Sequence, residues 1–199
     1  MNLREGSKLA DQVVDYMNRL NETLLSTQTT GKDGSPLELD AAADQTVGYW
    51  RNSNSNGGKI LLIGNGGSAA IVSHMQNDLA KAGGLQAMVF TEQPLLTAYT
   101  NDDGYDSAYE SMTKLWAGPN DVLVAISSSG SSENILRACR IIDEVGGRLI
   151  TFSGFSSNNP LRSLGDVNYY VNSDSYGIIE TAHAALGHYL TDSLAGLLT

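Results

Sequence analysis

Apolar residues in the first quarter of the chain recur at every third or fourth position. Residues 9–25, LADQVVDYMNRLNETLL, keep this spacing, which is typical of an amphipathic helix. The polar, glycine-containing residues 26–36 interrupt the pattern, and a second helix is predicted over residues 37–51. Both helices precede any predicted strand. We therefore expect residues 1–57 to form a helical appendage with a packing or oligomerisation role.

From residue 58 onward, short runs of consecutive apolar residues alternate with helical stretches. Consecutive apolar residues suit strands that are covered on both faces, and strand–helix alternation predicts a parallel sheet with right-handed crossovers. The predicted strands are residues 59–64, 85–90, 121–127, 148–153 and 167–172, with helices at 69–82, 106–117, 132–145 and 178–197. The sequence thus predicts one α/β domain over residues 1–199, in which residues 58–199 form a doubly wound, five-stranded parallel sheet.

Charge and composition narrow the class of partner. The 199 residues carry a formal net charge of −10, which argues against a nucleic-acid surface. Backbone N–H groups, hydroxyls and helix N-termini can still hold a small anion without positive side chains. No apolar run has the ~20 residues that span a bilayer, and the N-terminus lacks a signal-peptide pattern. With Cys139 as the single cysteine, a cytoplasmic setting is expected.

Two loops stand between a predicted strand and a predicted helix, where doubly wound folds bind their ligands. The first, GNGGS, covers residues 64–68, and its glycines let backbone N–H groups approach a ligand. It matches neither a dinucleotide-binding nor a P-loop motif, and by itself it is equally consistent with an ordinary tight turn. The second, SSSGSS, covers residues 127–132 and places hydroxyls at a helix N-terminus. Together the loops favour an anion site over a flexible linker.

The three histidines fall on two predicted helices. His74 and Asp78 are four residues apart, which puts them on one helix face. Glu180 and His188, eight apart, are expected to share a face of the last helix, with His183 about 60° off that line. A His–carboxylate pair on each helix can supply four ligands to Zn²⁺ or act in proton transfer. For any single histidine, an ordinary surface or core role remains the alternative.

The chain resembles the sugar isomerase (SIS) domain family, in particular its phosphoheptose isomerase type. The motifs that carry the resemblance are, in order along the chain, GNGGS…H…D, NDDG, ISSSGSS and E-x-x-H-x-x-x-x-H. The resemblance covers nearly the whole chain. It implies a flavodoxin-like SIS fold and a homotetramer with active sites at subunit interfaces. It also implies an aldose–ketose isomerase that converts sedoheptulose 7-phosphate to D-glycero-D-manno-heptose 7-phosphate with the help of zinc.

The resemblance assigns roles residue by residue. The phosphate would be held by Ser68, Ser127, Ser128, Ser129 and Ser132; the sugar would be contacted by Asn65, Gly66, Gly67, Asp102 and Glu180; and the metal would be held by His74, Asp78, Glu180 and His188. His188 is the preferred base for proton transfer, because an imidazole can both take and return a proton near neutral pH. Asp78 is the second candidate.

Four positions depart from the pattern of the phosphoheptose branch. Asp78 stands where the family often has Glu, and Glu180 where it often has Gln. An arginine often found at position 82 is replaced by Ala82, and an aspartate often found near Ile178 is missing. Two alternatives therefore stay open: an isomerase of another phosphosugar, and a non-catalytic SIS protein that binds a phosphosugar or a protein partner, as regulators of replication initiation do.

Overall fold

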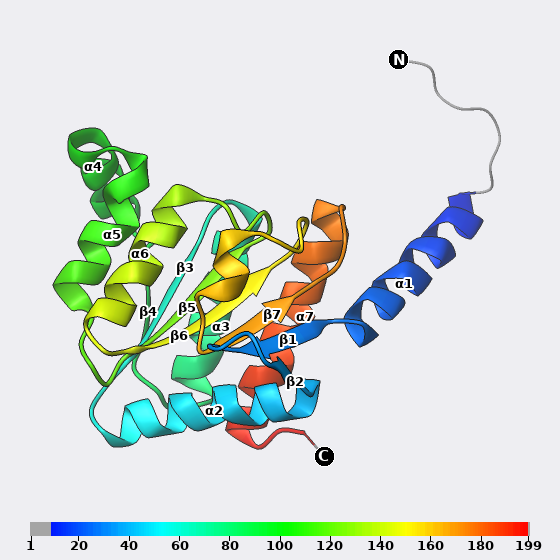
Figure 1. Ribbon diagram of the computed structural model, residues 1–199, viewed down its shortest axis with the longest axis horizontal. Helices are drawn as coiled ribbons and strands as arrows, with labels where there is room; N and C mark the ends of the chain where they lie inside the picture. The colour runs from blue at the N-terminus through cyan, green and yellow to red at the C-terminus, as the bar shows by residue number, and fades with distance from the viewer. Residues whose placement is uncertain (1–8, 199) are drawn as a thin grey trace.

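Five parallel strands form the centre of the molecule, and the computed structural model describes residues 9–198, with side chains from residue 12 onward (Figure 1). The strands are β3 (Ile60–Gly64), β4 (Ala87–Val89), β5 (Val122–Ser127), β6 (Arg148–Ser153) and β7 (Val167–Tyr170). Every residue of β3, β5 and β7 is buried, as expected for strands covered on both faces. The predicted five-stranded parallel sheet is therefore confirmed.

The sheet also has two strands that the sequence pattern did not reveal. A hairpin of β1 (Gln28–Gly31) and β2 (Pro36–Leu37) pairs antiparallel with β7, which gives the strand order β2-β1-β7-β6-β5-β3-β4. Residues 26–36 were predicted to be a polar break between helices, and Leu37 was predicted to begin the second helix. The hairpin strands are short and lie at the edge of the sheet, so they lack the apolar runs that identified the central strands.

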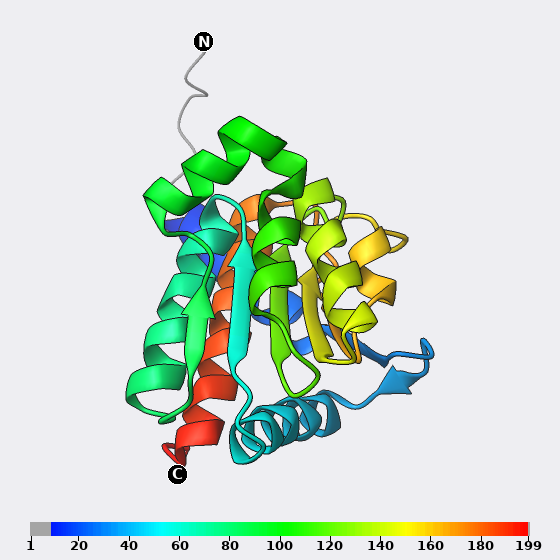
Figure 2. The same ribbon diagram turned by 90° about the vertical axis from the view of Figure 1, so that its left-hand side faces the viewer.

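Helices cover both faces of the parallel sheet, as the doubly wound prediction required. The helices are α1 (Leu9–Leu25), α2 (Leu39–Ser55), α3 (Gly67–Lys81), α4 (Gln93–Asp103), α5 (Tyr105–Trp116), α6 (Glu133–Glu144) and α7 (Tyr176–Ala195), with a short 3₁₀ helix, η1 (Pro160–Ser163). Helices α2, α3 and α7 pack on one face, against alternate residues such as Ile60 and Leu62. Helices α5 and α6 pack on the other face, against Leu61 and Ile63 (Figure 2).

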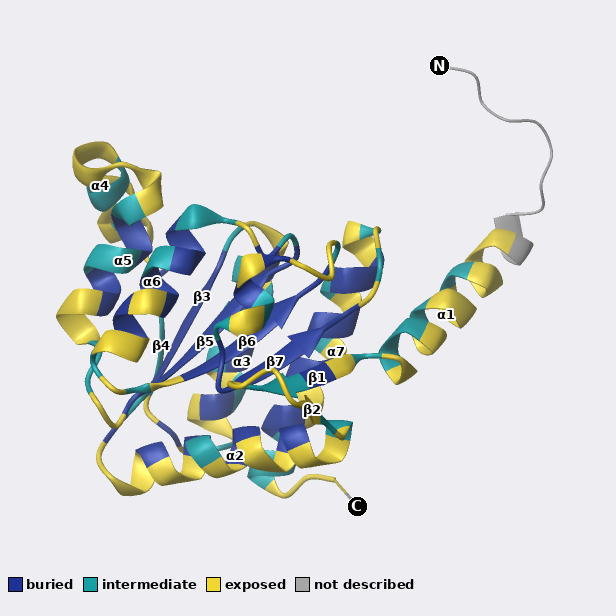
Figure 3. Ribbon diagram, viewed as in Figure 1, coloured by how far each residue is buried: buried dark blue, intermediate teal, exposed yellow. Residues whose placement is uncertain are grey.

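The two N-terminal helices differ in how they join the body. Helix α2 contributes Ala42, Val47 and Trp50 to the main core, so it is an integral layer of the fold. Helix α1 extends away from the sheet and is largely exposed, apart from contacts of its last turns with the core (Figures 1 and 3). Only α1 therefore corresponds to the expected appendage.

Helix α4 was also missed by the sequence pattern. It has no buried residue, so it lacks the apolar face that periodicity detects. Its start is nevertheless encoded locally: Glu92 accepts a hydrogen bond from the backbone N–H of Leu95 at 3.2 Å, and a proline follows in the first turn. Helix α4 leads into α5 at the carboxyl edge of the sheet (Figure 2).

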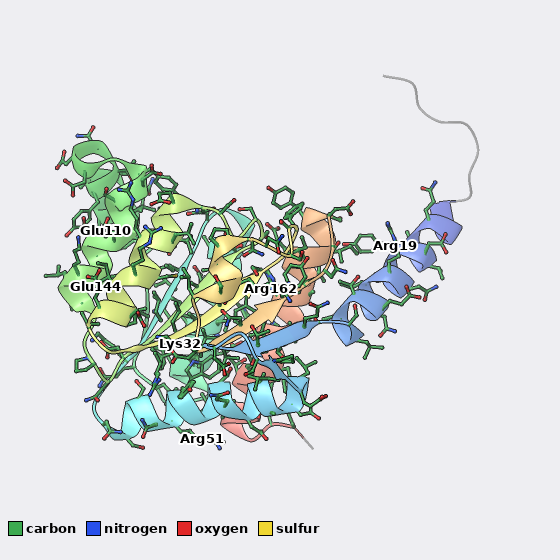
Figure 4. All side chains as sticks on the ribbon, in the orientation of Figure 1. Arg19, Lys32, Arg51, Glu110, Glu144 and Arg162 are labelled. Atoms are coloured by element: carbon green, nitrogen blue, oxygen red, sulfur yellow. The ribbon has the colours of Figure 1, made fainter. Side chains whose placement is uncertain are left out.

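Two of the charged side chains show how the periphery of the fold is exposed. Figure 4 shows the labelled Arg51 on α2 and Glu144 on α6 pointing away from the sheet, and both residues are exposed. Among the described residues, no helix is both long enough and apolar enough to cross a membrane.

Candidate functional site

The glycine turn that follows β3 is one wall of a pocket at the carboxyl edge of the sheet. Gly66 has φ +54°, a left-handed conformation that favours glycine, and it caps the start of α3. Gly67 lies so close to α7 that a Cβ atom there would overlap the carboxylate of Glu180. The turn therefore allows α7 to approach and brings Asn65 and Ser68 to the same opening.

The serine loop between β5 and α6 forms the opposite wall. The pocket is lined by Asn65, Ser68, Ser127, Ser128, Ser129, Ser132, Tyr176 and Glu180. Every phosphate-binding serine implied by the resemblance is therefore in this pocket. Ser127 donates a hydrogen bond from its hydroxyl to Ser132 at 3.3 Å, which fixes the two ends of the loop.

One hydroxyl in the pocket has an unused hydrogen-bonding capacity. Ser128 is 6% exposed, and its buried Oγ has no hydrogen-bond partner within the part of the chain that the structure describes. Leaving a buried hydroxyl unpaired costs about 1–3 kcal/mol. A bound anion would supply the missing partner, so Ser128 supports a ligand site here.

Tyr176 is a pocket residue that the sequence analysis missed. It is exposed and begins α7 at the mouth of the pocket, where its ring contacts Phe155 edge-on with 4.6 Å between ring centroids. Phe155 has φ +51°, the only positive φ of a non-glycine residue among those described. A phenylalanine in the left-handed conformation is strained and lowers the stability of the fold. This strained residue is the one that holds Tyr176 beside the pocket.

A second group of side chains lies between α3 and α7. The Nε2 atom of His74 lies 3.4 Å from Oδ2 of Asp78, and Nδ1 of His188 lies 3.5 Å from the same oxygen. One ligand atom from each residue lies within 4.8 Å of the others. Three of the four residues expected to bind metal therefore come together, in a His–Asp–His cluster that suits a divalent ion.

Two other expected site residues lie elsewhere. Glu180 lines the serine pocket and is not part of the His–Asp–His cluster. Asp102 is exposed near the C-terminal end of α4, where its carboxylate accepts a hydrogen bond from the side chain of Asn101 at 2.9 Å. The α4–α5 corner is nevertheless tied to the pocket, because the hydroxyl of Tyr105 donates to Oδ1 of Asn65 at 2.7 Å.

His183 belongs to the core and not to the cluster. It is fully buried, and Nε2 lies 3.2 Å from the carbonyl oxygen of Ser153, which it donates to in the neutral ring, while Nδ1 has no partner among the described residues. Burial lowers the pKa of His183 from 6.5 to about 4, although the bond to Ser153 acts in the opposite direction. The ring is therefore neutral at physiological pH.

Comparisons with known proteins show which family the chain belongs to. A protein-family model, the SIS domain, matches residues 15–154. A phosphoheptose isomerase of Solidesulfovibrio magneticus is 36% identical over 159 residues, which cover 77% of this chain and 76% of that protein. The chain belongs to the SIS domain family. The resemblance drawn from its motifs is thus confirmed.

A second relative and a solved structure extend the comparison to more of this SIS protein. A phosphoheptose isomerase of Geotalea daltonii is 34% identical over 163 residues, 79% of this chain and 84% of that protein. The solved structure of a phosphoheptose isomerase from Neisseria gonorrhoeae superimposes with a TM-score of 0.81 at 26% identity, and covers 94% of this chain and 99% of that one. The structural match is therefore broad enough to include most of the chain beyond residue 154.

The buried His183 predicts a specific pH dependence of stability. The unfolded chain takes up a proton near pH 6.5 and the folded chain only near pH 4, so falling pH favours unfolding across this window. The shift corresponds to a loss of about 3 kcal/mol, which the variant His183→Leu should not show. Urea denaturation at a series of pH values, followed by circular dichroism, measures the difference in slope. Equal acid destabilisation of the two proteins would contradict a neutral buried His183.

Proposed function

We propose that this SIS protein is a phosphoheptose isomerase, which interconverts sedoheptulose 7-phosphate and D-glycero-D-manno-heptose 7-phosphate. The observation that carries the proposal is that α3 and α7, which hold the His–Asp–His cluster, also contribute Ser68 and Glu180 to the hydroxyl-lined pocket. Curated relatives named phosphoheptose isomerase, 34–36% identical over more than three quarters of the chain, support the same activity. A non-catalytic regulator would have no need of the cluster.

The spacing along α3 supports a long phosphosugar as the substrate. Ser68 lies in the first turn of α3 and His74 six residues later, which is about 9 Å along the helix axis. A phosphate held at the serine pocket and a carbonyl held at the cluster would therefore be separated by a length of the order of an extended seven-carbon chain. The pocket lining contains no Lys or Arg, so hydroxyls and helix N-termini would bind the phosphate.

The reaction moves a proton between C1 and C2 of the sugar and shifts the carbonyl, through an enediolate. We assign the proton transfer to His188, whose Nδ1 faces Asp78 and leaves Nε2 for the substrate. Asp78 is the second candidate, since its carboxylate faces both histidine rings. In the direction from ketose to aldose, the proton that His188 removes from C1 is returned to C2, and a second proton moves from the C1 hydroxyl to the oxygen on C2.

The cluster also fits a divalent metal ion, for which we propose zinc. His74, Asp78 and His188 offer two imidazoles and a carboxylate, a three-ligand set of the kind that leaves a position open for substrate. When bound, such an ion polarises the substrate carbonyl and stabilises developing negative charge on oxygen. A histidine that binds the ion through one nitrogen keeps its proton on the other, so His188 could act as the base only while it is not a ligand, and His74 and Asp78 would then hold the ion.

We also propose a homo-oligomer, a tetramer, that covers α1. Val13, Val14 and Met17 are 53–59% exposed on one side of this helix. An apolar groove between α1, α2 and α7 lies nearby, and its lining includes Leu24 and Tyr189. A second copy of the chain would bury both surfaces and thereby remove apolar area from water.

The activity and the role of His188 are tested together. With zinc present, the protein should isomerise sedoheptulose 7-phosphate in preference to pentose and hexose phosphates. The variant His188→Ala should lose at least about 100-fold in kcat while it stays folded. Metal content distinguishes the roles: an inactive variant that retains zinc identifies His188 as the base, whereas one that loses zinc identifies a ligand. Near-normal turnover of the variant would remove His188 from the mechanism, and a wild type active only on another phosphosugar would overturn the assigned substrate.

The serine pocket predicts a loss of phosphate affinity without a loss of stability. Ser128→Ala removes an unpaired buried hydroxyl, so the folded protein should be at least as stable as the wild type. A lost hydrogen bond to the charged phosphate should raise KM by roughly 10- to 100-fold. Ser163→Ala is the matched control, because Ser163 is exposed, lies outside the pocket and donates its hydroxyl to the carbonyl oxygen of Pro160. Equal KM values for both variants and the wild type would contradict the anion site.

The oligomer is tested by placing a charge on each side of α1. Met17→Glu should shift the protein to a smaller species, because it puts a carboxylate on the apolar face. Asn18→Glu, on the polar face one residue away, should leave the assembly unchanged. Light scattering coupled to size-exclusion chromatography measures both masses. A monomeric wild type would overturn the proposal.

A further inference from the structure

Two tyrosines on one face of α5 attach this helix to the glycine turn of the pocket. Tyr109 is buried and donates a hydrogen bond from its hydroxyl to the carbonyl oxygen of Gly64 at 2.8 Å. Tyr105, one helical turn earlier, donates to Oδ1 of Asn65 at 2.7 Å and is 44% exposed. The first contact lies in the core, whereas the second reaches a side chain that lines the pocket.

A backbone group identifies which atoms of the Asn65 and Asn134 amides are the oxygens. The backbone N–H of Ile135 donates to Oδ1 of Asn134 at 3.0 Å, which fixes that atom as the oxygen. Asn134 Oδ1 also accepts from Nδ2 of Asn65 at 3.0 Å, and Asn134 Nδ2 donates to Oδ1 of Asn65 at 2.9 Å. Because Asn134 is only 2% exposed, this pair of amides is anchored in the interior.

The network leaves two hydrogen-bonding capacities unused. Oδ1 of Asn65 accepts from both Tyr105 and Asn134, so both of its lone pairs are occupied. Asn65 Nδ2 retains one hydrogen, and the Tyr105 hydroxyl, having given its proton to Asn65, retains acceptor lone pairs. The free N–H of Asn65 and the hydroxyl oxygen of Tyr105 therefore offer a donor and an acceptor side by side. An alcohol group matches this pair, because it can accept one hydrogen bond and donate another.

We propose that Tyr105 is a substrate-positioning residue: it fixes the amide of Asn65 and, together with that amide, binds a hydroxyl group on the sugar chain of the phosphosugar. This inference rests on the proposed function and deepens it. Tyr105 is not among the residues that line the serine pocket, so it should contribute to binding of the sugar and not of the phosphate.

The experiment separates sugar binding from phosphate binding. Tyr105→Phe should raise KM for sedoheptulose 7-phosphate by about 3- to 10-fold, because the bond to the sugar hydroxyl and one of the bonds that hold the amide are lost. The inhibition constant of inorganic phosphate should stay within about twofold of the wild-type value. Tyr109→Phe is the structural comparison: it breaks a bond to the same turn, so it should lower thermal stability without this selectivity for the sugar.

A double-mutant cycle tests whether Tyr105 acts through Asn65. Asn65→Ala should raise KM by itself, and adding Tyr105→Phe should then raise it by a smaller factor than in the wild type, since the amide to be held is gone and only the direct bond to the sugar hydroxyl is lost. Additive effects would overturn the positioning role. An unchanged KM in Tyr105→Phe would also overturn it, and so would a KM and a phosphate inhibition constant that rise together in this variant. Each of these two results would leave the proposed isomerase activity intact.

Direct binding keeps the two proposals distinguishable. Calorimetry with sedoheptulose 7-phosphate and with inorganic phosphate is done on the same wild-type and Tyr105→Phe proteins. If the wild type binds the phosphosugar without turnover and Tyr105→Phe weakens only that binding, the role of Tyr105 stands and the isomerase activity is overturned. A wild type that binds neither ligand would overturn both.

Discussion

The functional features of this chain depend on the parallel pairing of β3 with β5. In this register Gly64 lies opposite Ile126, so the two strands end at nearly the same level. The glycine turn and the serine loop leave the sheet side by side for that reason, and each opens into a helix N-terminus. Because both strands are buried on both faces, neither loop can shift without disturbing the core. A rigid, donor-rich pocket follows directly from strand register.

This arrangement would let an acidic protein bind an anion at the proposed site. The pocket holds serine hydroxyls, an asparagine amide and one carboxylate, that of Glu180, and its lining includes no Lys or Arg. The free energy of binding an anion would therefore come from hydrogen bonds and from the partial positive charge at the starts of α3 and α6. The hydroxyl of Ser128, which has no partner among the described residues, would contribute in the same way. It destabilises the free protein, and a ligand that accepts its hydrogen bond would remove that destabilisation.

The parts of the structure that could be predicted are those encoded by local pattern. Apolar runs identified all five parallel strands, and loop composition identified every serine in the pocket. The β1–β2 hairpin could not be found in this way, since it is defined by pairing with β7, more than a hundred residues away. Helix α4 and Tyr176 were missed because neither is buried, so hydrophobic periodicity carries no signal for them.

The placement of Glu180 shows the limit of reasoning from helical spacing. Eight residues turn an ideal helix through two revolutions and about 80° more, over an axial distance of about 12 Å. Glu180 and His188 therefore diverge: the first faces the serine pocket near the start of α7, and the second meets His74 and Asp78 beside α3. His183, between them, turns toward the sheet and is buried. Only the packing partners of α7 decide which of its residues meet.

Helix α7 also connects the candidate site to the exposed helix α1. A Cβ atom at Gly177 would lie 3.1 Å from the hydroxyl of Tyr16, so α1 passes close to the start of α7, next to Tyr176 at the pocket mouth. Any second copy that covered the apolar face of α1 would therefore approach the pocket as well. The strain at Phe155, whose ring holds Tyr176, lies at this same junction. The proposed assembly and the proposed ligand site would therefore meet at the contact between Tyr16 and the start of α7.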